Sequence, residues 1–449
     1  MTARCELRPV QPTPLEIALP RLRSFVSPFS GVIRTLGETL AAPDEHRLIS
    51  IGCQLADSVP TIGERLDWYT GSEHWRREHA EAAAIGEALE RYAGSFVPED
   101  RLVVGSADEL GAAAVDPSRF ALFSTAQYEH AGFSFEPFGR DTVVSWVEGF
   151  ALPDGERALL PAQLVYLPWR RRAEGEAKIG HATSSGLACG ATLEEAVLTG
   201  LLELVERDAF MLVWHNRLSL PLLDWSADAE LTRIDNRYFV PAGLRYSAVD
   251  LSAFLDVPCV LGVVHGPPGV LGALGVGAAS APTLGVAWRK ALAEAFSVQR
   301  WVRDMAFEEP ERLDRPADTI ATFDAHTLHY ATAARAKRAA FLDSSAARRP
   351  TAAVRPLEGE NVLEQIAAVI RRLEARQVSA YAVDVTSPDV LAAGLRVAHV
   401  VAPELCPLDV VEGARFLGGR RMYEAAFLAG LASRRLEPSE LNPDPHPFP

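Results

Sequence analysis

Two segments of the chain repeat one pattern of charged residues that could bind a metal ion. The pattern is E-x-x-E-R, and it occurs at Glu87-Ala-Leu-Glu90-Arg91 and at Glu203-Leu-Val-Glu206-Arg207. On a helix, positions i, i+3 and i+4 share a face, so each segment would present two carboxylates and one guanidinium together. Carboxylate oxygens are suitable ligands for Mg²⁺, and phosphate oxygens usually complete its coordination. Arginine side chains are suitable partners for phosphates. The alternative is a pair of ordinary surface ion-pair sets, although the apolar neighbours would make bare charges costly.

Three more polar residues could contact a ligand. Glu195 precedes Glu206 by eleven residues, so the two lie about 16 Å apart on a helix and cannot share one ion. They could contact different parts of one ligand. Gln299 and Arg303 lie four residues apart on another expected helix, where both could reach a phosphate or a base. A solvated helix face is the ordinary explanation of that pair taken alone.

The loop before the second motif and the end of the chain have unusual compositions. Residues 183–192 are small, and such a loop can offer an anion the N–H groups of a helix N-terminus, although a tight turn is the ordinary explanation. Alternating prolines from Pro443 to Pro449 can neither pair in a sheet nor continue a helix. They favour an extended rod that could carry its terminal carboxylate to a distant site, or else a disordered end.

Hydrophobic periodicity predicts the elements that would position these residues. Helices are expected at 73–92, 192–212, 284–305 and 361–376. Thr192 and Glu195 predict a capping box, and Asn361 is the expected N-cap of the last helix. Strands are expected at 142–150, 163–166, 257–264, 380–385 and 395–401. Because helices and strands are interspersed, the sequence predicts an α+β (mixed α/β) fold.

The overall composition is that of a folded globular protein. The chain has 449 residues, of which 48% are hydrophobic and 23% charged. Its net charge of −15 argues against a nucleic-acid partner. Five scattered cysteines without a C-x-x-C motif are typical of a reduced, cytoplasmic protein. The most apolar region, 257–286, is interrupted by prolines and glycines, so it predicts buried strands and no membrane span.

Taken together, these motifs resemble the YcaO domain of ATP-dependent cyclodehydratases. The similarity extends over nearly the whole chain from about residue 27 and is most specific from Ser185 to Ala209. Further matches are Ser27-Pro-Phe-Ser30-Gly-Val-Ile, residues 83–91 and 160–166, Gln299-Arg-Trp-Val-Arg303, Val383-Asp384-Val-Thr386 and the final Pro-His-Pro-Phe-Pro. The resemblance implies a single large domain at 27–435, with sheets flanked by helices and an ATP site between the two E-x-x-E-R helices. Residues 1–26 would be an extended lead-in, and 436–449 a Pro-rich tail that enters the active site.

The resemblance also implies a role for each candidate residue. The glutamates that would hold Mg²⁺ against the nucleotide phosphates are Glu87, Glu90, Glu203 and Glu206. The residues that would contact ATP are Ser30, Arg91, Glu195, Arg207, Gln299 and Arg303. The carboxylate of Pro449 would act as the catalytic acid or base. Three positions depart from the family pattern, because Ala83 and Ala188 stand where Ser is usual and Ala191 stands where Asn is usual.

The implied activity is ATP- and Mg²⁺-dependent conversion of Cys, Ser or Thr in a ribosomal precursor peptide into thiazoline or oxazoline. The 26 leading residues are too few for a leader-binding domain, so the resemblance implies a separate leader-binding partner related to ubiquitin-activating enzymes. A flavin-dependent azoline dehydrogenase is an optional further partner. The resemblance is also compatible with a homodimer. The alternatives are a thioamide- or macroamidine-forming relative, a non-catalytic scaffold subunit, which the three alanines motivate, and a translation-linked accessory protein.

Overall fold

The computed structural model describes residues 6–43, 45–59, 66, 69–170 and 174–449, and all that follows concerns these residues. The chain divides into two compact units, each assembled from separate stretches of sequence. Unit 1 contains Met1–Leu40, Ile49–Leu204 and Glu358–Glu404, and unit 2 contains Ala41–Leu48, Val205–Leu357 and Leu405–Pro449. The boundaries expected from the sequence, 27–435 and 436–449, stay a prediction.

Unit 1 is built on two sheets. The first has three antiparallel strands in the order β1-β2-β3. The second has the order β4-β5-β13-β14-β7, with β6 paired to β5, and its neighbouring strands are antiparallel. The strands are β1 (Ile33–Thr39), β2 (Ile49–Leu55), β3 (Tyr69–His74), β4 (Leu102–Gly105), β5 (Val144–Ala151), β6 (Arg157–Pro161), β7 (Leu187–Gly190), β13 (Tyr381–Asp384) and β14 (Arg396–Val401). The helices are α1 (Leu15–Arg23), α3 (Arg77–Ser95), α4 (Ala107–Leu110), α5 (Thr125–Tyr128), α11 (Val362–Glu374), α12 (Pro388–Ala392) and the first part of α6 (Leu193–His215).

Helix α3 contacts both sheets of unit 1. It packs against β2 and β3 of the first sheet and against β7 and β14 of the second. Its buried face is rich in alanine, with Ala80, Ala84 and Ala88 fully enclosed beside Ile85 and Leu89. Small side chains allow close approach of the strands on either side, so the helix is held from two directions. The first E-x-x-E-R motif therefore lies on a firmly positioned element.

Unit 2 is built on one five-stranded sheet in the order β11-β10-β9-β8-β12. The β12–β8 pair is parallel and the other neighbouring strands are antiparallel. The strands are β8 (Leu222–Asp224), β9 (Arg245–Asp250), β10 (Cys259–His265), β11 (Leu274–Ser280) and β12 (Arg348–Pro350). The helices are the end of α6, α7 (Ala229–Tyr238), α8 (Leu284–Glu308), α9 (Phe323–His329), α10 (Ala333–Ala336) and α13 (Arg421–Leu428).

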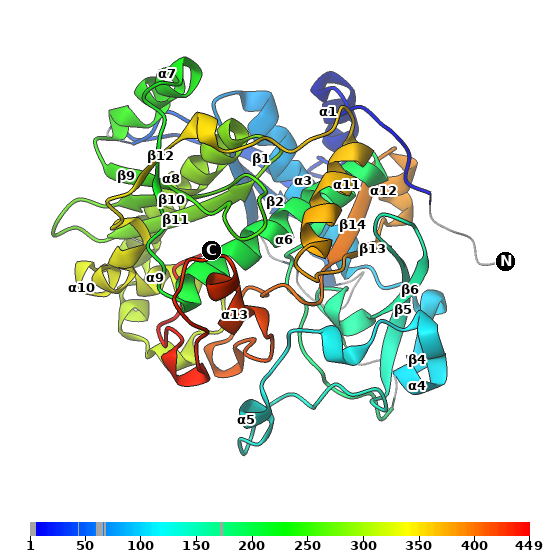
Figure 1. The fold of residues 1–449 in the computed structure, drawn as a ribbon. Helices are drawn as coiled ribbons and strands as arrows, with labels where there is room; N and C mark the ends of the chain where they lie inside the picture. The colour runs from blue at the N-terminus through cyan, green and yellow to red at the C-terminus, as the bar shows by residue number, and fades with distance from the viewer. Residues whose placement is uncertain (1–5, 44, 60–65, 67–68, 171–173) are drawn as a thin grey trace. The chain divides into compact units, whose positions relative to one another are not determined.

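Glycines let helix α8 lie directly on strands β10 and β11 (Figure 1). A Cβ atom at Gly275 would lie 2.4 Å from the Ala295 carbonyl oxygen and 2.5 Å from the Cβ of Gln299. A Cβ atom at Gly262 would lie 2.5 Å from the Ala291 carbonyl oxygen. Both contacts are too short for any side chain, so glycine is required where helix and sheet meet. The close approach at Gly275 also fixes the position of Gln299 relative to β11.

Most of the elements expected from the sequence are present. Helices α3, α6, α8 and α11 occupy the four expected segments, although α3 begins at Arg77 because Tyr69–His74 forms strand β3. Strands β5, β10, β13 and β14 occupy four of the five expected strands. The strand expected at 163–166 is wrong, because Ala162–Leu164 forms a short 3₁₀ turn. There the buried Gln163 amide donates to the Ala177 carbonyl (2.6 Å) and accepts the Ile179 N–H (3.1 Å). The side chain thus satisfies two backbone polar groups of the neighbouring loop.

The N-terminal segment is not extended throughout, contrary to expectation. Helix α1 forms within it and contains Pro20. Leu19 and Leu22 are both buried, and Leu22 belongs to the main core of unit 1. The burial of this apolar face outweighs the one backbone hydrogen bond that proline removes.

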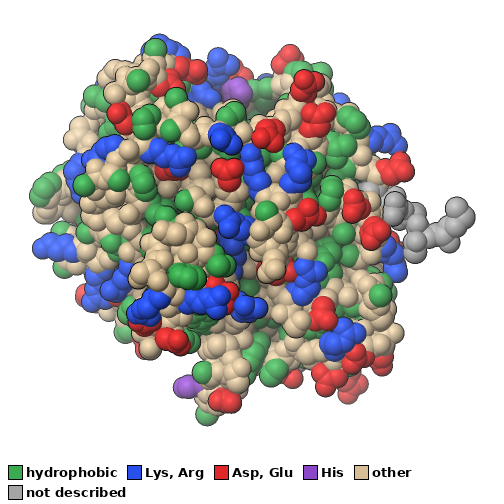
Figure 2. All heavy atoms as spheres, in the orientation of Figure 1, with side chains coloured by type: hydrophobic (Ala, Val, Ile, Leu, Met, Phe, Trp, Pro, Cys, Tyr) green, Lys and Arg blue, Asp and Glu red, His purple; other side chains and the backbone are tan. Residues whose placement is uncertain are grey.

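Basic and acidic side chains are interspersed over the face drawn in Figure 2. Such a mixture is typical of a solvated surface. Within the described ranges, no helix combines the length and the apolar character needed to cross a membrane.

Candidate functional site

In unit 1, helices α3 and α6 bring glutamates of both motifs together. Glu90 on α3 accepts a hydrogen bond from the Cys189 N–H of strand β7 (2.8 Å). Glu203 on α6 accepts one from the Gly186 N–H (2.9 Å). Gly186 has a φ of 89°, and a Cβ there would lie 2.3 Å from the Val400 carbonyl oxygen. Only glycine can therefore present this N–H to the carboxylate.

The electrostatics of this glutamate cluster fit a cation. Burial, together with the nearby carboxylates of Glu203 and Glu87, raises the pKa of Glu90 to about 8. The Cys189 N–H and the Arg91 guanidinium oppose that rise. Arg91 also lies 3.7 Å from Glu87, its neighbour one turn earlier on α3. A bound cation would offset the repulsion between these carboxylates and favour their ionised forms.

The cluster is not a complete metal cage. In the described part of the chain, no three His, Cys, Asp or Glu side chains converge closely enough to hold a metal ion. In nucleotide sites Mg²⁺ keeps water and phosphate oxygens and takes only one or two carboxylates from the protein. Glu90 and Glu203 therefore fit a cation that arrives with a nucleotide better than a resident structural metal.

The start of α6 confirms the predicted capping box and shows what Glu195 contacts. One Glu195 oxygen accepts the Thr192 N–H (3.1 Å), while the Glu195 N–H donates to the Thr192 hydroxyl (3.2 Å). The other oxygen accepts the N–H of Thr13 from the N-terminal segment. Both oxygens of this predicted ATP-contacting residue thus have backbone donors. Ser30, the other such residue outside the motifs in this unit, is exposed in a turn, where its N–H lies 3.3 Å from the Ser27 hydroxyl.

In unit 2, the second motif continues along α6. Glu206 is buried, accepts the Ser280 N–H of β11 (3.3 Å) and lies 3.1 Å from Arg207. Asp208, the next residue, is fully buried and binds two nitrogens of Arg421 at 2.7 Å each. Sequence reasoning assigned no role to Asp208. Its place directly after the motif and before the apolar residues 209–214 was the available signal.

Helix α8 carries Gln299 and Arg303 one turn apart. Gln299 is buried, and its amide donates to the Gly272 carbonyl (2.9 Å). Arg303 contacts Asp304 (3.1 Å) and the buried carboxylate of Glu45. The acceptors of Arg303 in this structure are therefore two carboxylates. The sequence could not predict Glu45, because it lies 258 residues from its partner.

The C-terminal tail is ordered and packs inside unit 2, so the disordered alternative is wrong. His446 is 1% exposed and Phe448 is fully buried, whereas Pro449 is partly exposed. The Phe448 ring lies 4.7 Å from the ring of Phe210, measured between centroids. The Arg207 guanidinium lies 4.5 Å from the centroid of the Phe448 ring. The residue next to the predicted catalytic carboxylate therefore contacts the second motif.

The structure thus groups the predicted residues within each unit. In unit 1 it brings together Glu87, Glu90, Arg91 and Glu203, and it places Glu195 at the start of α6 and Ser30 in an exposed turn. In unit 2 it joins Glu206 and Arg207 to the tail that ends in Pro449, and it places Gln299 and Arg303 on α8.

Comparison with known proteins gives a family match over most of the chain. The family model that matches residues 74–406 is described as YcaO cyclodehydratase, ATP- and Mg²⁺-binding. A curated relative, an uncharacterized protein of Methanothermobacter thermautotrophicus, is 27% identical over 268 residues, which are 54% of this chain and 65% of the relative.

Two solved structures have a similar fold. A heterocyclase in complex with substrate and cofactor has a TM-score of 0.82 at 22% identity, over 99% of this chain and 59% of that one. A YcaO protein from Methanopyrus kandleri bound with AMPPCP and Mg²⁺ has a TM-score of 0.62 at 20% identity, over 90% and 94%. This chain thus spans 65% of the curated relative and 59% of the heterocyclase.

The two structures confirm the expected mixed α/β fold, and at these identities they show the fold alone. The family description agrees with the predicted cofactors, ATP and Mg²⁺. Because the family model covers well over half of the chain, the assignment does not depend on any single motif. The chain belongs to the YcaO family.

Proposed function

We propose that this chain is an ATP- and Mg²⁺-dependent cyclodehydratase that acts on a peptide backbone. The observation that carries the proposal is the glutamate cluster of unit 1, where burial and the neighbouring carboxylates raise the pKa of Glu90 to about 8. Such a cluster is costly without a cation and well suited to one. Support also comes from the family description and from the fold shared with a heterocyclase solved with substrate and cofactor.

In the proposed reaction, a Cys, Ser or Thr side chain adds through its thiol or hydroxyl to the carbonyl carbon of the preceding residue and gives its proton to a base. The former carbonyl oxygen, now an oxyanion, takes the γ-phosphoryl group of ATP, and ADP leaves. The C–O bond then breaks with loss of phosphate, the amide nitrogen loses its proton, and a thiazoline or oxazoline remains. Phosphorylation is needed because an amide oxygen is otherwise a very poor leaving group.

The proposal gives each predicted residue one task. When bound, Mg²⁺ neutralises and orients the phosphates of ATP. Glu87, Glu90, Glu203 and Glu206 hold the cation, and Ser30, Arg91, Glu195, Arg207, Gln299 and Arg303 contact the nucleotide. Glu90 must lose its proton to do so, which ties cation binding to pH. The Pro449 carboxylate exchanges a proton at the reacting amide.

The proposal also includes partner molecules. The substrate is a ribosomal precursor peptide, and a separate protein related to ubiquitin-activating enzymes captures its leader. A flavin-dependent azoline dehydrogenase would then act on the product.

Calorimetric titration with Mg-ATP tests the proposal. The proteins compared are the wild type, Glu206→Gln, and Glu78→Gln as a matched control, because Glu78 is an exposed residue of α3 outside the motif. We expect the wild type and the control to bind equally and Glu206→Gln to bind at least about tenfold more weakly, since the amide keeps the shape and loses the charge. No binding by any of the three would contradict the proposal and favour the scaffold alternative.

A further inference from the structure

Side chains of unit 2 hold the backbone of the C-terminal tail. From Asn442 to Pro449 every second residue is proline, which lacks an N–H, so carbonyl oxygens dominate the polar groups to be satisfied. The donors are Arg415 to the Asn442 carbonyl (2.9 Å), Trp214 to that of Asp444 (3.0 Å) and Tyr330 to that of Pro445. Nδ1 of His326 lies 3.2 Å from the His446 carbonyl oxygen. Side chains that are distant in sequence thus satisfy the carbonyl oxygens of the tail.

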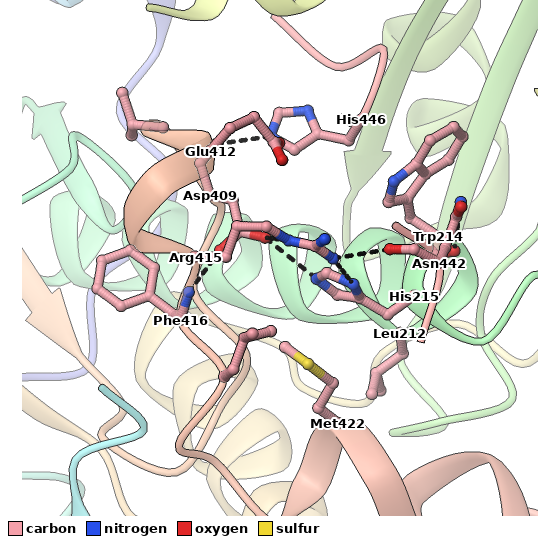
Figure 3. A network of polar contacts seen from close by, with 12 residues as sticks. Leu212, Trp214, His215, Asp409, Glu412, Arg415, Phe416, Met422, Asn442 and His446 are labelled. Atoms are coloured by element: carbon pink, nitrogen blue, oxygen red, sulfur yellow. Dashed lines mark hydrogen bonds and ion pairs between the residues drawn. The ribbon is translucent and has the colours of Figure 1, made fainter. Parts of the chain in front are cut away.

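A buried ionic network lies behind the tail (Figure 3). Arg415 donates to Nδ1 of His215 (2.7 Å), so the proton of that ring is on Nε2, which donates to Asp409 (3.1 Å). Asp409 also accepts the Phe416 N–H (2.7 Å). Because Arg415 binds the Asn442 carbonyl as well, the network fixes the start of the tail.

His446 fixes the direction of the last three residues. Its ring stacks on that of His326, with centroids 4.0 Å apart and an angle of 8° between the planes. Nε2 of His446 donates to the Asp409 carbonyl (2.6 Å), and Nδ1 accepts the Phe448 N–H (3.2 Å). The second bond requires the neutral ring, and burial lowers the pKa of His446 well below its ordinary range. Phe448 is thereby directed toward α6.

The Phe448 ring is the contact between this anchored tail and the second motif. The Arg207 guanidinium lies 4.5 Å from the ring centroid, while its Nε lies 3.1 Å from the Glu206 carboxylate. A guanidinium over a buried aromatic face is favourable, and stacking also restricts the plane of the guanidinium.

We propose that Phe448 is a positioning residue that holds the Arg207 guanidinium beside Glu206, so that the buried tail sets the geometry of the phosphate-binding end of the motif. This inference rests on the proposed function, which assigns Arg207 to the nucleotide and the Pro449 carboxylate to the reacting amide. Pro449 follows Phe448 directly, so the Cα atoms of the two residues are about 3.8 Å apart. One short segment thus serves both the nucleotide and the reacting amide.

The test separates the Phe448 ring from the terminal carboxylate. Phe448→Leu removes the aromatic face, and a single glycine added after Pro449 moves the carboxylate while keeping the ring. Phe254→Leu is the matched control, because Phe254 is an equally buried phenylalanine of unit 2 outside the tail. Mg-ATP affinity is measured by calorimetry for all three and for the wild type. Hydrogen exchange of the C-terminal peptide is measured in the wild type and in Arg207→Lys, which keeps the charge and loses the flat guanidinium.

We expect Phe448→Leu to bind Mg-ATP about tenfold more weakly, and the glycine extension and Phe254→Leu to bind like the wild type. Arg207→Lys should raise the exchange rate of the tail amides about tenfold. Equal affinity losses in the two leucine variants, or a loss in the extended chain as large as that in Phe448→Leu, would overturn the inference. If the wild type itself bound no Mg-ATP, the proposed function would fail, and unchanged tail exchange in Arg207→Lys would separately refute the positioning role.

Discussion

Replacing Glu90 with glutamine should change how the stability of the free protein depends on pH. In the folded protein the pKa of Glu90 is about 8, against 4.5 for an ordinary glutamate. The folded state therefore holds this proton more tightly than the unfolded state does, so the stability that the wild type has below pH 4.5 is lost as pH rises toward 8. At about 1.4 kcal/mol per pH unit, the loss reaches about 3 to 5 kcal/mol above pH 8.

The glutamine side chain stays neutral at every pH, so Glu90→Gln should not suffer this loss. The variant should match the wild type near pH 4 and exceed its free energy of unfolding by about 3 to 5 kcal/mol at pH 9. Urea unfolding at a series of pH values, without Mg²⁺ or nucleotide, measures this difference. Glu78→Gln, an exposed glutamate on the same helix, is the control and should give a curve parallel to that of the wild type.

Mg-ATP should narrow this difference in stability. A ligand present at a hundredfold excess over its dissociation constant stabilises the folded state by about 2.7 kcal/mol. At pH 8 the wild type should gain this stabilisation and Glu90→Gln should gain little of it, because the amide cannot supply the charge. Parallel pH curves for the wild type and Glu90→Gln would refute the argument that Glu90 is held in a repulsive, cation-seeking cluster. Equal stabilisation of both by Mg-ATP would remove Glu90 from the metal site.

Two further predictions test the framework around the site. Gly275→Ala should destabilise unit 2 by about 1 to 3 kcal/mol and weaken Mg-ATP binding, because its Cβ would push α8 and Gln299 away from β11. Gly285→Ala on the same helix meets only an ordinary contact, so in urea unfolding it should be neutral or slightly stabilising; a similar loss there would contradict this packing argument. Asp208→Asn should cost about 3 to 5 kcal/mol in urea unfolding, since it leaves the buried Arg421 without its charged partner. A loss below 1 kcal/mol would mean that Arg421 finds another acceptor.

Much of the local structure follows from the sequence alone, because it depends on neighbours within a few residues. The capping box of Thr192 and Glu195 formed as predicted, and so did the Asn361 cap, whose side chain accepts the Glu364 N–H (3.0 Å). Periodicity identified the helices that carry both E-x-x-E-R motifs, and the motifs identified the family. The strand predicted at 163–166 failed because the Gln163 amide is satisfied by a loop fourteen to sixteen residues away.

The tertiary structure decided which polar groups are buried and which groups they contact. The sequence shows Glu90 as one acid among many, and only burial beside Glu203 raises its pKa to about 8. The sequence shows a tail of alternating prolines, and only the fold supplies the donors that bury it and set Phe448 against Arg207. The physical reason is common to both. Capping and periodicity are short-range effects of the chain itself, whereas desolvation and the satisfaction of carbonyl oxygens depend on groups that are distant in sequence and meet only on folding.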